Sequence, residues 1–214
     1  DFYVNEVGID SRKISVMPNP IKMPKVNPKK KIDPIMVLFS GRIGERKGTF
    51  DLISAWSRMS SEMRKNAILN ITGDGNISKA TRMIENLGIS ESVKILGWIS
   101  DDELESLFSQ SSIYVLTSRN EGLPMGLLEA MSHSCAVITS PVGGIPEVIE
   151  NKQNGVLVQP GDIGRITESL EFLISDNISR EALSYNARKS VDPLEISTYN
   201  NKLHGLWRKI LSQE

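Results

Sequence analysis

Two glutamates, Glu121 and Glu129, stand eight positions apart in the stretch SRNEGLPMGLLEAMSHSCAVI, which covers residues 118–138. Glu121 lies in a predicted loop with Gly122 and Pro124, and Glu129 lies on the apolar helix expected to follow. Free backbone N–H groups at that helix start, together with the helix dipole, favour an anion there. The arrangement suits a long ligand with an anionic middle and hydroxyl groups on either side, as in a nucleotide sugar. It also fits an exposed acidic loop before an ordinary amphipathic helix.

A second charged loop, SGRIGERKGTF, spans residues 40–50. Gly41 and two further glycines let the backbone turn tightly, and Arg42, Arg46 and Lys47 place cations in the same loop. Arginine suits bidentate phosphate contact, and lysine acts as a point charge. The loop is therefore interpreted either as a diphosphate clamp or as a charged turn. Its spacing matches neither a Walker loop nor the GxGxxG fingerprint of dinucleotide-binding proteins.

Three further turns follow predicted strands, at residues 73–75, 97–99 and 141–147. The turn at residues 73–75 either keeps the backbone clear of a ligand or simply ends a strand. Trp98 in the second either stacks on a base or plugs the edge of the core. The third exposes backbone N–H groups at the start of a short helix or forms an ordinary tight connection. Each turn alone is open to both interpretations.

Other reactive residue types have simpler explanations. The acidic run at residues 101–103 invites a metal site, but acids in a first helical turn are stabilised by the helix dipole. His133 and His204 have no ligand partner at metal spacing. Cys135 begins an apolar strand and is expected in the core, and no nucleophile elbow occurs. We therefore expect neither a metal nor a cofactor.

The elements that must position these residues alternate along the chain. Apolar runs ended by turn residues predict strands at residues 35–41, 67–73, 93–96, 112–117, 135–140 and 155–159. Helical patterns predict helices at about residues 50–59, 79–88, 100–110, 123–133, 145–149, 162–174, 179–190 and 195–211. The alternation predicts an α/β fold, a Rossmann-like doubly wound six-stranded parallel sheet. Ligands of such sheets bind at the C-terminal strand ends, so the loops at residues 41–48 and 117–123 should lie side by side.

Composition restricts the class of protein. The chain has 214 residues, 39% hydrophobic and 24% charged, with a net charge of −1, so no global charge favours nucleic acid. One cysteine and no apolar run of membrane-spanning length indicate a protein of the cytoplasm. Residues 1–34, with four prolines between positions 18 and 28, are predicted as a tail and connector. Lys29–Lys31 there are expected on a solvated face, and the missing initial methionine indicates a fragment.

Taken together, these motifs resemble the retaining GT-B glycosyltransferases of the glycosyltransferase 4 group. The matching pieces, in family order, are Pro18-Asn19, Gly41-Arg42 through Lys47-Gly48, Gly73-Asp74-Gly75, Gly97-Trp98, Glu121 through Glu129-Ala-Met, Pro141 through Glu147, and Asn154-Gly155. The resemblance runs from about residue 12 to 175. Seven pieces in series are much more specific than any one of them.

The resemblance implies a protein of two Rossmann-like domains with the active site between them. This chain looks like the C-terminal domain alone, which binds the nucleotide-sugar donor. Residues 1–34 would be the tail of the other domain and the hinge, residues 35–192 the donor-binding domain, and residues 193–214 a C-terminal helix that packs back toward the other domain. A glycan or lipid-linked acceptor would bind the missing domain, and the whole protein would associate peripherally with a membrane or stay free in the cytoplasm.

The family's functional residues carry over position by position. Arg42 and Lys47 would bind the diphosphate, and Glu121 would hold hydroxyl groups of the sugar; these three form the expected catalytic set. Glu129 would bind the ribose. The remaining residues expected around the donor are Gly41, Gly73, Trp98, Ile99, Gly122, Leu123, Pro124 and Met125. The reaction implied is sugar transfer from a UDP-, GDP- or ADP-sugar with retention and without a metal.

Two departures and several alternatives stay open. Ser134 and Ala136 stand where the family usually has glycine and proline, which puts the local helix cap in doubt. The catalytic residues that the family takes from its other domain are absent. The alternatives are a non-catalytic nucleotide-binding or scaffold module and a sugar-nucleotide epimerase. A phosphorylase would need a pyridoxal lysine motif, which the sequence lacks.

Overall fold

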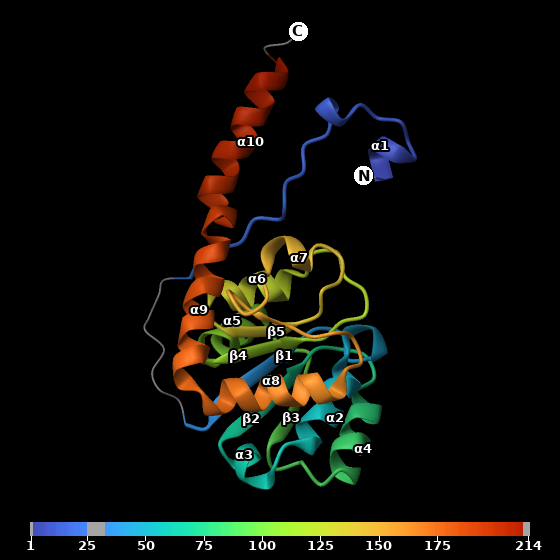
Figure 1. Cartoon of the computed structure of the whole chain (residues 1–214), viewed down its shortest axis with the longest axis vertical. Coiled ribbons are helices and arrows are strands. Elements are labelled where there is room, and N and C mark those ends of the chain that lie inside the picture. The colour runs from blue at the N-terminus through green and yellow to red at the C-terminus, as the bar shows by residue number, and fades with distance from the viewer. Residues whose placement is uncertain (1, 25–32, 212–214) are drawn as a thin grey trace.

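Six parallel strands form one sheet in the order β3-β2-β1-β4-β5-β6 (Figure 1). The computed structural model describes residues 2–24 and 33–211. The strands are β1 Ile35–Ser40, β2 Ala67–Thr72, β3 Val93–Gly97, β4 Ile113–Leu116, β5 Ala136–Thr139 and β6 Val156–Leu157. Every pairing is parallel. This is the doubly wound order of a Rossmann-like fold, so the predicted fold class is confirmed.

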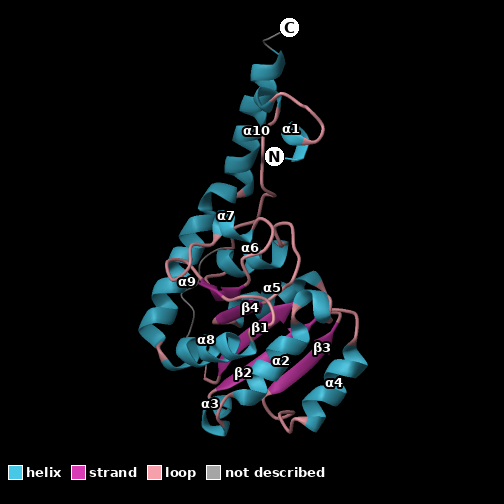
Figure 2. Cartoon of the chain, turned by 45° about the vertical axis from the view of Figure 1, so that its right-hand side comes forward, coloured by secondary structure: helices cyan, strands magenta, loops and turns pink. Residues whose placement is uncertain are grey.

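Helices cover both faces of the sheet. They are α1 Phe2–Asn5, α2 Thr49–Arg58, α3 Ser61–Lys65, α4 Ile77–Asn86, α5 Asp101–Gln110, α6 Met125–Ser132, α7 Ile145–Val148, α8 Ile163–Ser175, α9 Asn177–Val191 and α10 Ile196–Leu211, with 3-10 turns η1 Ser11–Lys13, η2 Glu45–Lys47 and η3 Asp192–Leu194. Right-handed crossovers put α2 and α4 on one face and α5 and α6 on the other. Helix α8 packs against α2, in front of the strands in Figures 1 and 2, and α9 packs against α6.

The central strands are buried from both sides, as continuous apolar runs require. Val37, Leu38 and Phe39 of β1 and all four residues of β4 are at most 1% exposed. Trp56 of α2 is fully buried, and its indole N–H donates to the Ser92 hydroxyl at 3.0 Å. The core thus holds the C-terminal ends of β1 and β4 rigidly beside each other.

The start of α5 follows the predicted capping chemistry, and three other elements differ from the prediction. The capping box between Ser100 and Glu103 at the start of α5 is present. Helix α6 begins at Met125, two residues later than predicted, because Pro124 is its N-cap residue with extended backbone. The short helix α3 was missed, since five residues carry too little periodicity to detect. Strand β6 has two residues and not the predicted five, although the Val158 N–H after it still donates to the Thr139 carbonyl at 2.9 Å.

The C-terminus of α6 forms a Schellman motif without glycine. The Ser134 N–H donates to the Met131 carbonyl and the Cys135 N–H to the Ala130 carbonyl, both at 2.9 Å. Ser134 has φ +56°, in the left-handed region where glycine is favoured. The cap that the sequence put in doubt is therefore formed, at the cost of a strained serine. Cys135 is buried, as predicted.

Backbone hydrogen bonds join the N-terminal segment to the start of helix α10. Helix α10 extends away from the sheet, and the N-terminal segment runs beside it (Figure 1). Ile21 joins them: its N–H donates to Leu194 at 2.9 Å, and its carbonyl accepts from Ile196 at 3.0 Å. The predicted Lys29–Lys31 face lies outside the described residues. Within residues 2–24 and 33–211, no helix is both long and apolar enough to cross a membrane.

Candidate functional site

The loops that follow β1 and β4 lie side by side, as predicted from the strand order. Val37 and Leu38 of β1 pair with β4, which makes this the point where strand order reverses. The Arg119 N–H donates to the Arg46 carbonyl at 2.8 Å, directly joining one loop to the other. Residues 73 positions apart in sequence are thereby brought into one site.

Lys47 and Glu121 form an ion pair at this junction. The Lys47 Nζ lies 2.7 Å from the Glu121 Oε1, and the two side chains are only 16% and 6% exposed. The Ser118 hydroxyl donates to the same carboxylate oxygen at 2.6 Å. Two residues that were predicted to share a site thus touch each other. A short, charge-assisted hydrogen bond between largely buried groups holds both side chains in fixed positions.

The turn after β5 supports the Glu121 loop from behind. Gly143 has φ +58°, and a Cβ placed on it would lie 2.0 Å from the Glu121 carbonyl oxygen. The Gly144 N–H donates to the Gly122 carbonyl at 2.6 Å. This N–H group is therefore occupied by the neighbouring loop, and the turn acts as a backing for residues 121 and 122. Only glycine fits at position 143.

The start of α6 is held close to the end of β1. The buried Tyr114 hydroxyl donates to the Ser40 carbonyl at 3.2 Å. A Cβ on Gly126 would lie 2.8 Å from that hydroxyl, so glycine permits the close approach. Burial and then the charge of Glu129 raise the pKa of Tyr114, which keeps the phenol neutral. The α6 start, whose N–H groups have no side-chain cap, is thus fixed at the C-terminal end of β1.

Arg42 lies on the other side of the β1 loop. Its side chain is 71% exposed, and its guanidinium lies 4.0 Å from the Asp74 carboxylate. The Gly41 N–H donates to the Thr72 carbonyl at 3.0 Å, which joins the β1 and β2 loops. Arg42 is therefore free to reorient toward a ligand, because an exposed ion pair at this distance holds it weakly.

The turn after β3 presents an exposed aromatic ring. Trp98 is 81% exposed, so the interpretation that it plugs the core is wrong. The Gly97 carbonyl accepts from the Gly73 N–H at 2.8 Å, which ties this turn to the end of β2. Ile99 beside it is partly buried. An exposed tryptophan held on a fixed turn can stack on a flat apolar ligand group.

Glu129 opens into a pocket of about 370 Å³ between α5 and α6. The pocket is lined by Pro20, Ile21, Lys22, Asp101, Leu104, Glu105, Phe108, Met125, Glu129, Ser132 and His133. Burial, and then the nearby charge of Asp101, raise the pKa of Glu129. The two glutamates therefore have separate surroundings, Glu121 against a cation and Glu129 in an acidic, half-buried pocket.

Several of these residues were not singled out from the sequence. Ser118 and Arg119 stood next to a predicted loop glutamate, and Lys22 lay in a segment interpreted as a connector. Asp101 was explained by its place in a first helical turn, which is correct but incomplete. Within the described parts of the chain, no cluster of three or more histidine, cysteine or carboxylate side chains is placed to hold a metal ion.

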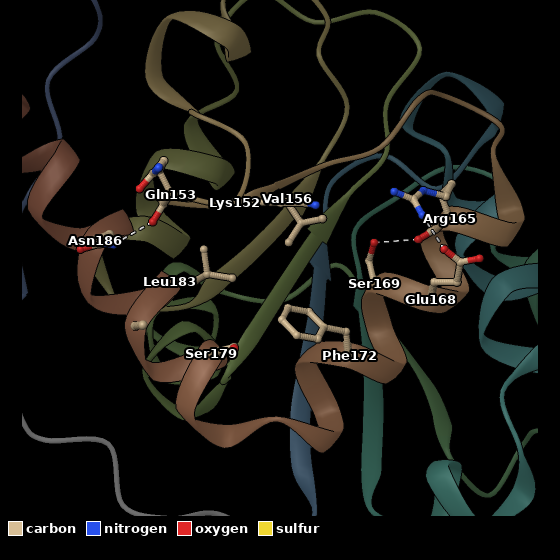
Figure 3. A pocket seen from close by; sticks show the side chains of 11 residues that line it. Lys152, Gln153, Val156, Arg165, Glu168, Ser169, Phe172, Ser179, Leu183 and Asn186 are labelled. Carbon is tan, nitrogen blue, oxygen red and sulfur yellow. Dashed lines mark hydrogen bonds and ion pairs between the residues drawn. The ribbon is translucent and has the colours of Figure 1, made fainter.

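A separate hollow of about 440 Å³ lies between α8 and α9 (Figure 3). Phe172 and Leu183 line its apolar part, and Arg165 and Glu168 form an ion pair at its edge. None of the predicted site residues lines it. The residues singled out from the sequence lie instead in the loops at the C-terminal ends of the strands and on α6.

The chain is an α/β domain whose Rossmann-like sheet carries cations and carboxylates at the point where the strand order reverses. The family model described as glycosyl transferases group 1 matches residues 22–190. The chain belongs to this family, and its fold is that of the GT-B C-terminal domain.

Individual relatives agree with this assignment. The chain is 33% identical over 160 residues to an uncharacterized glycosyltransferase of Methanocaldococcus jannaschii, covering 74% of this chain and 40% of that protein. It is 28% identical to the lipopolysaccharide outer core galactosyltransferase WaaB in its apo form, with a TM-score of 0.78, covering 96% of this chain and 58% of that one.

Anabaena HepE, solved in complex with UDP and glucose, superposes with a TM-score of 0.73 at 22% identity, covering 82% of this chain and 48% of that one. At this identity the likeness shows the fold alone. The chain spans 35% to 58% of the length of the curated relatives that it matches.

Proposed function

We propose that this chain is the donor-binding domain of a glycosyltransferase that moves a sugar, of the hexosyl type, from a nucleotide sugar to an acceptor with retention of configuration. The observation that carries the proposal is the buried Lys47–Glu121 pair at the switch point of the sheet. In the proposed site, Lys47 would supply a cation for the diphosphate, and Glu121, in the loop that leads into α6, would supply a carboxylate for the sugar hydroxyls. The complexes of HepE with UDP and with UDP-glucose support a nucleotide donor.

The width of the site fits the donor's length. Trp98 follows β3 and Glu121 follows β4, and these strands are separated by β2 and β1. Three strand spacings amount to about 14 Å. A nucleoside diphosphate laid along these strand ends would place its base at Trp98 and Ile99, its ribose at Glu129 and its sugar at Glu121. Gly41, Gly73 and the α6 start at Gly122–Met125 would border the phosphates.

The chemistry assigned to the site is stabilisation of the leaving diphosphate. The acceptor oxygen forms the new bond to the anomeric carbon as the bond to the diphosphate breaks, and the acceptor's proton leaves with the diphosphate. Lys47, Arg42 and the N–H groups of the α6 start would meet the developing charge, in the place that a metal ion takes in other transferases. Glu121 would hold sugar hydroxyls and is not assigned as a nucleophile.

The rest of the reaction is assigned to a second domain. We place the acceptor, a glycan or a lipid-linked glycan of polysaccharide synthesis, on that domain, in the cytoplasm or at the inner face of a membrane. The chain alone should then bind a nucleotide and turn over poorly. An epimerase would instead interconvert nucleotide sugars without any acceptor, and a non-catalytic nucleotide-binding or scaffold module would transfer no sugar.

Calorimetric titration of the chain with UDP, GDP and ADP tests the proposal. We expect one of them to bind and to raise the melting temperature in a concentration-dependent way. Lys47→Met should weaken that binding at least tenfold, and Lys189→Met, on the exposed surface of α9, should leave it unchanged. If none of the three binds at millimolar concentration, the proposal fails. Acceptor-free conversion of UDP-glucose would favour the epimerase.

A further inference from the structure

We propose that Arg119 is a positioning residue that sets the separation of the β1 and β4 loops, and through it the contact between Lys47 and Glu121. The inference rests on the proposed function, in which this contact forms the diphosphate and sugar site. Arg119 would touch neither the donor nor the acceptor. It would act by holding the two loops that do.

The contacts of Arg119 reach the second half of the β1 loop and the first turn of α2. Its backbone N–H donates to the Arg46 carbonyl at 2.8 Å. One guanidinium nitrogen, Nη1, donates to the Glu45 carbonyl at 2.8 Å and to the Asp51 carboxylate at 2.6 Å. In return, Arg46 donates to the Asn120 carbonyl at 3.3 Å. The segment that carries Lys47 is therefore joined to the segment just before Glu121 by four hydrogen bonds.

This arrangement differs from an ordinary surface ion pair. Asp51 lies on the first turn of α2 and is only 13% exposed, so its carboxylate is a fixed anchor. Arg119 and Asp51 are 68 positions apart, and their contact joins two loops of the site. By contrast, Arg165 and Glu168 are neighbours on one helix and are 64% and 63% exposed (Figure 3). The Arg165–Glu168 contact is similarly short, at 2.7 Å, but it joins two residues of the same helix and no separate segments.

The lysine itself cannot fix the geometry. Its side chain has four flexible bonds, so the 2.7 Å contact with Glu121 depends on where the two backbones lie. A misplacement of about 1 Å in a group that positions a substrate can cost a hundredfold in rate. The Arg119 guanidinium, whose Nη1 donates to a carbonyl and to a carboxylate together, would hold the two loops in position.

Comparing the affinity for a nucleoside diphosphate with the affinity for the nucleoside alone separates this positioning role from a general loss of stability. For whichever of UDP, GDP or ADP binds the wild-type chain, Arg119→Met should weaken the nucleoside diphosphate about tenfold and leave the affinity of the matching nucleoside unchanged. Arg119→Lys, which keeps one charged contact with Asp51, should restore part of the loss. Arg165→Met should alter neither affinity. Equal losses for nucleoside and diphosphate, or no loss at all, would overturn the proposal.

Hydrogen exchange tests the same inference without any nucleotide. In Arg119→Met, the amides of residues 44–48 and 117–122 should exchange at least several-fold faster, while those of β2 and α8 keep their wild-type rates. Unchanged exchange in the two loops would refute the positioning role even if nucleotide binding were confirmed. Faster loop exchange in a chain that binds no nucleotide would instead sink the proposed function and leave the loop contact established.

Discussion

Replacing Gly143 by alanine should damage the site by displacing the backbone of Glu121 and Gly122, without replacing any residue that is proposed to bind a ligand. Gly143 lies in the turn after β5 with φ +58°, and an added Cβ would lie 2.0 Å from the Glu121 carbonyl oxygen and 2.6 Å from that of Gly122. Both are backbone atoms, so no side chain can rotate away. The loop that carries Glu121 must move by more than 1 Å to restore van der Waals contact.

Two costs add up in this variant. A left-handed conformation costs a residue other than glycine about 1–2 kcal/mol, partly offset by about 0.4–1 kcal/mol from the stiffer unfolded chain. Overpacking costs about 1–3 kcal/mol more. The free energy of unfolding should fall by about 2–4 kcal/mol in total, which corresponds to about 5–15 °C in melting temperature for a chain of this size.

Gly88→Ala supplies the matched control. Gly88 follows α4 with φ +64°, and an added Cβ would meet no atom within 4 Å. It should therefore show only the backbone term, about 1 kcal/mol. Circular dichroism melts and calorimetry with the nucleoside diphosphate that binds best compare the two variants. Only Gly143→Ala should lose affinity, by at least tenfold. Equal melting temperatures in the two variants, or wild-type affinity in Gly143→Ala, would refute the reasoning.

Three further outcomes are expected. Lys47→Met leaves the Glu121 carboxylate buried beside a single hydroxyl donor, so the free energy of unfolding in urea should fall by about 1–3 kcal/mol. Lys47→Met combined with Glu121→Gln should cost less than the sum of the two single variants. Strict additivity would contradict a direct contact between the two side chains. Burial raises the pKa of Glu129, so between pH 4.5 and that raised pKa the folded chain binds more protons than the unfolded chain. The contribution of this group to the free energy of unfolding therefore falls as the pH rises through this range. Glu129→Gln should thus be at least as stable as wild type at pH 7, lose that advantage near pH 4, and bind the nucleotide more weakly; a variant less stable than wild type at pH 7 would argue against the shift. Ser134→Gly relieves a left-handed serine and should raise the melting temperature by about 1–4 °C, and a lower melting temperature would show that φ +56° is not strained here.

Much of the fold was predictable because its signals are local. Continuous apolar runs such as residues 35–40 indicate strands covered on both faces, and the capping box at Ser100 marks a helix start. Alternation of strands and helices, with right-handed crossovers, leaves few sheet orders to choose from. The placement of the β1 and β4 loops side by side followed from that order.

Part of the candidate site could also be predicted from local sequence signals. Glu121 precedes α6 and Glu129 lies on it because their spacing along the chain places them there. The exposure of a side chain could not be predicted from local signals. Tryptophan is a residue type expected in a core, and Trp98 is in solvent only because its turn lies at the edge strand β3. A sequence pattern does not record which strand lies at an edge.

By itself, the sequence determined the types of the site residues and the loops that carry them, because hydrophobic periodicity and turn chemistry act within a few residues of one another. Only the tertiary structure decided which of those residues touch. The contact of Lys47 with Glu121 spans 74 positions, and that of Arg119 with Asp51 spans 68. Such contacts depend on strand order, on loop backbones and on one glycine behind the loop, none of which leaves a periodic trace in the chain.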